Sequence, residues 1–90
     1  MFTIEIKRKA LRKLTKLDKK RKETIKEIIS TLKLYPIPFK KADVSKLKGY
    51  DNVYRIRAGD TRIVYEILWA RRTIIINYIG TREKAYRKTV

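Results

Sequence analysis

The feature that most constrains the fold is a pair of strand-like segments separated by only two residues. Val53–Ala58 and Thr61–Trp69 are rich in β-branched and aromatic residues and alternate in polarity, and Gly59 and Asp60 lie between them. A glycine at the first central position accepts the positive φ of a two-residue type II′ turn. We therefore predict a β-hairpin whose register is set by this turn.

The register of this hairpin divides its side chains into two faces. One face carries large apolar side chains that we expect in the core: Tyr54, Ile56, Ile63, Tyr65 and Ile67. The other face carries Arg55, Arg57 and Arg62. Like charges that face each other destabilise a sheet, and arginine's planar, forked donors match phosphate oxygens, so the cluster favours an anion site. The alternative is a solvated basic surface with an ion pair between Arg55 and Glu66.

The N-terminal half predicts a strand followed by two helices. Phe2, Ile4 and Ile6 alternate with polar residues, which is typical of a strand with one buried face. Apolar residues then recur at helical spacing over 8–17 and again after Asp18, the expected N-cap of a second helix that Pro36 ends. The two helices should form an antiparallel hairpin.

The rest of the chain completes an α+β prediction of one domain over residues 1–90. Residues 36–52 are predicted to connect the second helix to the hairpin, and Thr73–Ile79 to form the last strand. The helix hairpin would pack on a mostly antiparallel sheet of about four strands. Arg82–Lys88 is expected to add one or two helical turns.

Charge and missing residue types narrow the function classes. Lys and Arg number 25 against nine Asp and Glu, a net charge of +16, which favours a polyanionic partner such as nucleic acid or an acidic protein. The chain has no Cys and no His, so we expect no metal, no cofactor and no thiolate or histidine chemistry. It offers neither a signal-peptide core nor a membrane-spanning run, so we expect a cytoplasmic protein without a membrane partner.

Two segments resemble the signature of RelE-type toxins. Val53–Tyr65 contains Y-R-I-R followed by R-I-V-Y, and Gly80–Tyr86 contains G-x-R-x-x-x-Y, in the family's order and spacing. The preceding strand and helix hairpin match too, so the resemblance covers nearly the whole chain. It implies a RelE-like, microbial ribonuclease-like fold and the toxin of a type II toxin-antitoxin system.

The resemblance further implies a ribosome-dependent endoribonuclease, an mRNA interferase that contacts rRNA and cuts messenger RNA in the decoding site. The RNA 2′-hydroxyl would attack the adjacent phosphorus and leave a 2′,3′-cyclic phosphate, which inhibits translation. By this resemblance Arg82 matches the family's general acid, Arg62 the residue that stabilises the phosphorane charge, and Tyr86 the aromatic that stacks the base. Arg55 and Arg57 match two basic positions on the second strand.

The proton acceptor is left open. The best-studied member has lysine at both basic positions, whereas arginine, with a pKa above ~12, is a poor base. Electrostatic stabilisation by the arginines, or Glu66 or Tyr86 as the base, are the alternatives. Taken alone, Tyr86 would also suit the edge of a core.

The resemblance also implies an acidic RelB-type antitoxin as partner, and the last strand would accept an added strand from it if it lay at or near a sheet edge. Two other functions remain open. A ParE-like toxin shares the fold and acts on DNA gyrase, but such relatives generally lack the pair formed here by Arg82 and Tyr86. A non-enzymatic basic RNA-binding domain would bind with strong salt dependence and form no cyclic phosphate.

Overall fold

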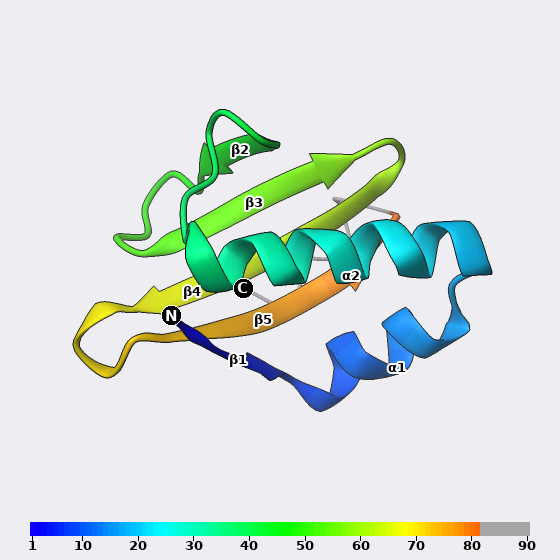
Figure 1. Cartoon of the computed structure of the whole chain (residues 1–90), viewed down its shortest axis with the longest axis horizontal. Helices are drawn as coiled ribbons and strands as arrows, with labels where there is room; N and C mark the ends of the chain where they lie inside the picture. Colours follow the sequence, from blue (N-terminus) through cyan, green and yellow to red (C-terminus); the bar gives the residue numbers. More distant parts are fainter. Residues whose placement is uncertain (82–90) are drawn as a thin grey trace.

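The computed structural model of the protein describes residues 1–81, which form one five-stranded sheet and two α-helices (Figure 1). Along the chain the elements are β1 (Thr3–Ile6), α1 (Arg8–Lys16), α2 (Lys19–Leu34), β2 (Asp43–Lys46), β3 (Val53–Ala58), β4 (Thr61–Leu68), the 3₁₀ turn η1 (Trp69–Arg71) and β5 (Thr73–Gly80). The strand order is β1-β5-β4-β3-β2, with only the β1–β5 pair parallel. The predicted α+β class is confirmed, with five strands instead of about four.

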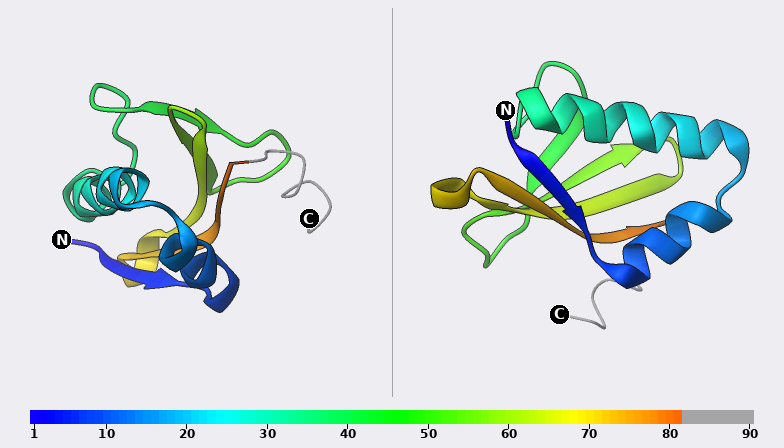
Figure 2. Two further views of the ribbon diagram at one scale, coloured as in Figure 1. Left: turned by 90° about the vertical axis from the view of Figure 1, so that its right-hand side faces the viewer. Right: turned by 60° about the horizontal axis from the view of Figure 1, so that its bottom comes forward.

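Both helices lie on one face of the sheet, and no helix of residues 1–81 covers the other face (Figure 2). Asp18 caps α2 as predicted, because its carboxylate accepts a hydrogen bond from the Arg21 backbone N–H. Helix α2 ends before Pro36, whose ring disfavours a helical conformation at the preceding residue. None of the helices within residues 1–81 is long and apolar enough to cross a membrane.

The core lies between the helices and the sheet. Every large apolar side chain predicted for the inner face of the hairpin is buried there, which confirms that part of the pattern. The core consists of Phe2, Ala10, Leu14, Ile25, Leu32, Tyr54, Ile56, Ile63, Tyr65, Ile67, Ile74, Ile76 and Ile79. Tyr65, the largest side chain that is fully buried there, stacks on Tyr54, and the Tyr65 hydroxyl donates a 2.7 Å hydrogen bond to the Pro36 carbonyl.

The turn between β3 and β4 has the predicted geometry. Gly59 adopts a φ of +62°, and Arg72 is the one described non-glycine residue with a positive φ, so Asp60 has a negative φ. Positive φ at the first central position alone is the mark of type II′ and excludes type I′. The register follows, with Ala58 opposite Thr61.

The prediction for residues 36–52 is wrong in one respect, because Asp43–Lys46 forms the edge strand β2 against β3. The strand has four residues, and only Val44 and Ser45 are even half-buried. So short and exposed a strand gives little alternation in hydrophobicity, and the prolines before it and Gly49 after it favour a loop.

The last strand, β5, lies near a sheet edge, one strand in from it. The sheet edges are β1 and β2, and Thr73–Ile76 is covered by β1 on one side and by β4 on the other. The register between β4 and β5 shifts after Val64, which pairs with Tyr78, whereas Tyr65 pairs with Ile76. Asn77 is therefore the extra residue of a β-bulge.

Candidate functional site

The three arginines predicted to share a face do so. Arg57 lies directly opposite Arg62, and Arg55 lies two residues before Arg57 on the same strand. All three alternate with core residues, so their side chains lie on the face of the sheet away from the helices. We call Arg55, Arg57 and Arg62 the arginine face. Arg57 is exposed, whereas the other two are half-buried.

Strand β2 adds polar groups that the sequence did not reveal. Asp43 pairs with Arg57, and its carboxylate accepts a 3.1 Å charged hydrogen bond from the Arg57 Nε. Ser45 pairs with Arg55, whose Nη2 lies 3.4 Å from the Ser45 Oγ. Neither partner is apparent from the sequence, because the pairing of β2 with β3 brings them to the arginines. The side chain of Arg55 thus contacts Ser45 on the neighbouring strand.

The end of β5 brings an aromatic ring to the arginine face. Gly80 pairs with Arg62, whose Nη1 donates a 3.3 Å hydrogen bond to the Thr81 carbonyl. The Tyr78 ring lies across Gly80, where a Cβ would come within 2.8 Å of the Tyr78 Cζ. Only a residue without a side chain leaves that space to the ring. Tyr78 is thus a further residue beside the arginine face that the sequence did not indicate.

The β-bulge explains why the pattern hid Tyr78. Simple alternation after the buried Ile76 would turn Tyr78 toward the helices, but the extra residue Asn77 reverses the phase. Tyr78 consequently shares the face of Val64 and Arg62, and Ile79 enters the core. A single irregularity thereby moves an aromatic side chain from one side of the sheet to the other.

The two remaining predicted residues, Arg82 and Tyr86, lie outside the described residues. Their proximity to the arginine face is therefore a prediction from the sequence. Within residues 1–81 no group of three or more His, Cys, Asp or Glu side chains lies together as a metal site would require.

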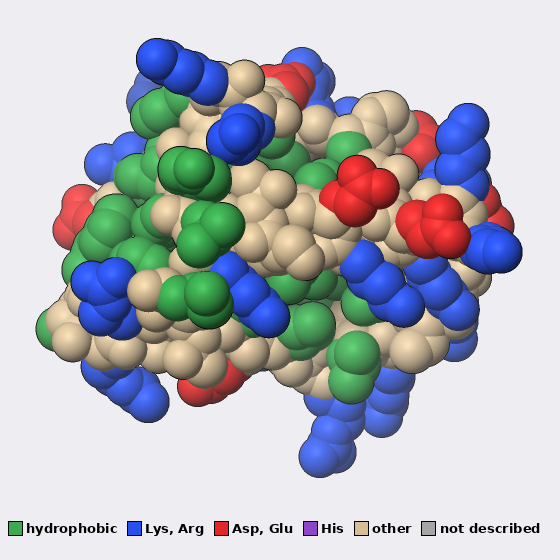
Figure 3. Space-filling view, viewed as in Figure 1, with side chains coloured by type: hydrophobic (Ala, Val, Ile, Leu, Met, Phe, Trp, Pro, Cys, Tyr) green, Lys and Arg blue, Asp and Glu red, His purple; other side chains and the backbone are tan. Residues whose placement is uncertain are grey.

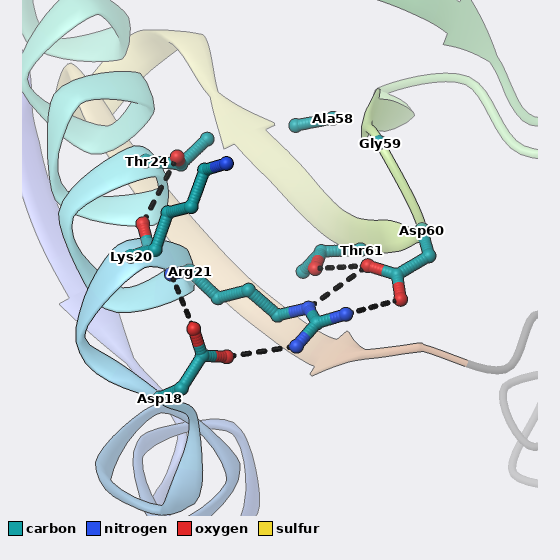
Figure 4. A pocket seen from close by; sticks show the side chains of 8 residues that line it. All are labelled: Asp18, Lys20, Arg21, Thr24, Ala58, Gly59, Asp60 and Thr61. Carbon is teal, nitrogen blue, oxygen red and sulfur yellow. Dashed lines mark hydrogen bonds and ion pairs between the residues drawn. The ribbon is translucent and has the colours of Figure 1, made fainter.

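An ion network holds the hairpin tip against the start of α2 (Figure 4). The Arg21 guanidinium donates to the Asp60 carboxylate through Nε at 2.9 Å and through Nη2, and its Nη1 donates to Asp18 at 2.8 Å. These hydrogen bonds hold the pKa of Asp60 and the pKa of Asp18 below their usual value. The same two carboxylates raise the pKa of Arg21. The network fixes the turn that sets the register of the arginine face.

The chain is similar to known toxins over nearly its whole length. Residues 4–86 match the family model described as the ParE toxin of the type II toxin-antitoxin system, parDE. The chain is 45% identical over 86 residues to the toxin RelE1 assigned in Methanocaldococcus jannaschii, covering 96% of each protein. This chain belongs to the RelE/ParE toxin family. It is a RelE-type toxin of a toxin-antitoxin system.

Solved structures share the toxin's fold over nearly its whole length. RelE in the archaeal RelE–RelB complex from Pyrococcus horikoshii OT3 superposes with a TM-score of 0.82 at 29% identity, covering 92% of this chain and 97% of that one. The RelB–RelE complex from Methanococcus jannaschii gives 0.77 at 28% identity over 96% and 99%. The isolated RelE toxin of E. coli, at 19% identity and a TM-score of 0.77 over 99% and 95%, supports the fold alone.

Proposed function

We propose that this toxin is a ribosome-dependent endoribonuclease that cleaves messenger RNA in the decoding site and so inhibits translation. The observation that supports this most is the arginine face. Arg57 and Arg62 are directly opposed on neighbouring strands, an arrangement that destabilises a sheet unless an anion lies between the charges. Asp43 forms an ion pair with Arg57. An RNA phosphate would satisfy the forked donors of the arginines.

The proposed reaction needs no group besides RNA and protein side chains. The 2′-oxygen bonds to the adjacent phosphorus, the bond to the 5′-oxygen breaks, and the products are a 2′,3′-cyclic phosphate and a 5′-hydroxyl. Arg62 would stabilise the negative charge that builds on the phosphorane, and Arg55 and Arg57 would bind the phosphate oxygens. Donors fixed in place for such a charge are each worth on the order of 10²–10³ in rate. Orientation of the messenger by the ribosome supplies the rest.

The C-terminal segment Arg82–Lys88 contributes the remaining proposed roles. Arg82 would protonate the leaving 5′-oxygen and Tyr86 would stack on a base, both on the strength of the sequence resemblance. Tyr78 is a second candidate for base stacking, because its ring shares the face of Arg62.

The proton acceptor for the 2′-hydroxyl is a separate question, since arginine is a poor base. On the strands next to β3, this face carries two carboxylates, Asp43 on β2 opposite Arg57 and Glu66 on β4 opposite Val53. The variants Asp43→Asn and Glu66→Gln test these two carboxylates separately as the proton acceptor. The variant that removes the base should lose the rise of the cleavage rate with pH.

We further propose that an acidic RelB-type antitoxin holds this toxin inactive. The relatives from Pyrococcus horikoshii and Methanococcus jannaschii are complexes of RelE with RelB. The net charge of +16 favours rapid encounter with an acidic chain.

The test incubates the purified toxin with programmed ribosomes and maps messenger RNA ends by primer extension. Arg62→Ala is compared with Arg71→Ala, which removes one positive charge from the exposed η1 turn. Decoding-site cuts that vanish only in Arg62→Ala would support the proposal. RNA binding without a cyclic-phosphate product would instead support a non-enzymatic RNA-binding domain.

DNA gyrase is the second candidate target, because the matching family model is that of the ParE toxins. If gyrase is the target, the folded toxin should arrest growth and leave messenger RNA intact. It should also block supercoiling by purified gyrase. The sequence pair Arg82 and Tyr86 favours the ribonuclease.

A further inference from the structure

Large apolar side chains are exposed at one end of the molecule. Their exposed fractions are 78% for Met1, 61% for Leu34, 49% for Tyr35, 67% for Phe39 and 47% for Trp69. Figure 3 shows hydrophobic side chains gathered at the end where α2 finishes and the chain begins. We call these five residues the apolar end. Contiguous exposed apolar surface on a small protein usually marks an interaction site.

The apolar end is continuous although its residues come from distant segments. The Phe2 backbone N–H donates a 2.9 Å hydrogen bond to the Lys33 carbonyl, which places Met1 beside Leu34. The Phe2 and Trp69 rings meet edge to face with centroids 5.7 Å apart. The N-terminus, the end of α2 and η1 therefore form one surface.

The segment after α2 extends this surface and hollows it. A depression of about 300 Å³ is lined by Tyr35, Ile37, Pro38, Phe39, Lys40 and Lys41. The Lys41 ammonium lies 5.1 Å from the centre of the Tyr35 ring. The Tyr65 hydroxyl holds the Pro36 carbonyl, so the segment is fixed to the core. An apolar hollow that is already shaped can receive a partner side chain with little loss of entropy.

Positive charge predominates around the apolar end, although Glu27 lines a neighbouring hollow with Pro38 and Lys41. Segments 1–4, 28–42 and 67–81, which build it, contain no Asp or Glu. They contribute five cations: Lys33, Lys40, Lys41, Arg71 and Arg72. A partner that fits therefore combines apolar side chains with acidic neighbours, because complementary charge speeds encounter and disfavours other partners.

We propose that the apolar end anchors an acidic, amphipathic segment of the antitoxin. The inference rests on the proposed function, which supplies an acidic protein partner. Helix α2 covers the sheet face opposite the arginines, and the apolar end includes its C-terminal residues. The anchor is thus separate from the arginine face. Antitoxin affinity and toxin activity can then be changed independently.

The experiment compares Leu34→Ser and Phe39→Ser with Leu11→Ser. Leu11 is a matched control, since it is 45% exposed on α1 and does not belong to the apolar end. Each toxin variant is titrated with the antitoxin encoded in the same gene pair, and the dissociation constant is measured by biolayer interferometry. We expect at least a tenfold weaker complex for the first two variants. Leu11→Ser should stay within about twofold of the wild type, since exposed single substitutions away from an interface have small effects. Cleavage by the free toxins and their circular dichroism spectra should be unchanged.

Equal affinity of Leu34→Ser, Phe39→Ser and wild type would overturn the inference while antitoxin binding itself stands. Wild-type toxin that does not bind this antitoxin would overturn the proposed partner as well. Light scattering of the toxin alone tests a second copy as occupant. A dimer that Leu34→Ser dissociates without changing antitoxin affinity would replace the proposal with self-association.

Discussion

Tyr65→Phe is expected to destabilise the toxin through one hydrogen bond and to release the segment that carries part of the apolar end. The Tyr65 side chain is fully buried, and its ring stacks on Tyr54 with centroids 5.8 Å apart. Its hydroxyl donates to the half-buried Pro36 carbonyl at 2.7 Å. Phenylalanine preserves the ring and the stacking, so the substitution removes the hydrogen bond alone.

The expected loss in the free energy of unfolding follows from the loss of the hydrogen-bond donor to the Pro36 carbonyl. A buried acceptor deprived of its donor costs about 1–2 kcal/mol. In a domain of this size each kcal/mol lowers the melting temperature by roughly 4–8 °C, so a decrease of about 5–15 °C is expected. Tyr65→Ala also removes the ring and should cost about 3–5 kcal/mol.

The stability of the protein at alkaline pH should also depend on Tyr65. Burial raises the pKa of the Tyr65 phenol above its usual 10.0. A group whose pKa is higher in the folded state favours folding below its unfolded pKa, and this contribution is lost as pH rises above about 10. Tyr65→Phe has no phenol at this position and should lose less stability than wild type between neutral pH and pH 11.

The assay is thermal unfolding followed by circular dichroism at pH 7 and at pH 11. Tyr50→Phe is the control, because it removes the hydroxyl of a tyrosine that is 39% exposed and should change stability by at most about 0.5 kcal/mol. Equal melting temperatures for Tyr65→Phe and Tyr50→Phe would show that the Pro36 hydrogen bond contributes nothing net.

Three further substitutions test other parts of the structure. Arg62→Ala should lower single-turnover cleavage on programmed ribosomes by about 10²–10³ without changing the circular dichroism spectrum, and an undiminished rate would remove Arg62 from the site. Because Arg21 holds the pKa of Asp18 and the pKa of Asp60 below 3.8, their contribution to stability is present above about pH 4 and is lost as pH falls through the lowered values. Arg21→Met should flatten urea midpoints between pH 2 and 4, and curves parallel to wild type would contradict this role. Gly59→Ala places a side chain at a φ of +62° and should cost about 1 kcal/mol in urea unfolding, whereas an unchanged midpoint would mean that the turn adjusts without strain.

The hairpin could be predicted in detail because its information is local. Gly59 admits a positive φ, two residues separate the strands, and pairing outward from the turn then places every side chain. Counting residues outward from the turn is enough to place Arg57 opposite Arg62. The Asp18 cap and the end of α2 before Pro36 are local signals of the same kind.

Features that depend on distant segments could not be predicted. Strand β2 is defined by its bonds to β3, and its own four residues show too little alternation to indicate a strand. Asp43 was consequently missed as the partner of Arg57. Tyr78 was missed because the bulge at Asn77 reverses the alternation of side chains, and the sequence of β5 does not indicate this bulge.

The pairing of β1 with β5 determines when the molecule can be completed during synthesis. Thr3, near the start of the chain, pairs with Thr73, and Ile6 pairs with Ile76. The β3–β4 hairpin can form from neighbouring residues, but β1 must wait until β5 has been made. Arg62 also lacks its neighbour Gly80 until then. Under the proposed function, a growing chain should therefore remain inactive toward the ribosome that is making it at least until β5 has been made.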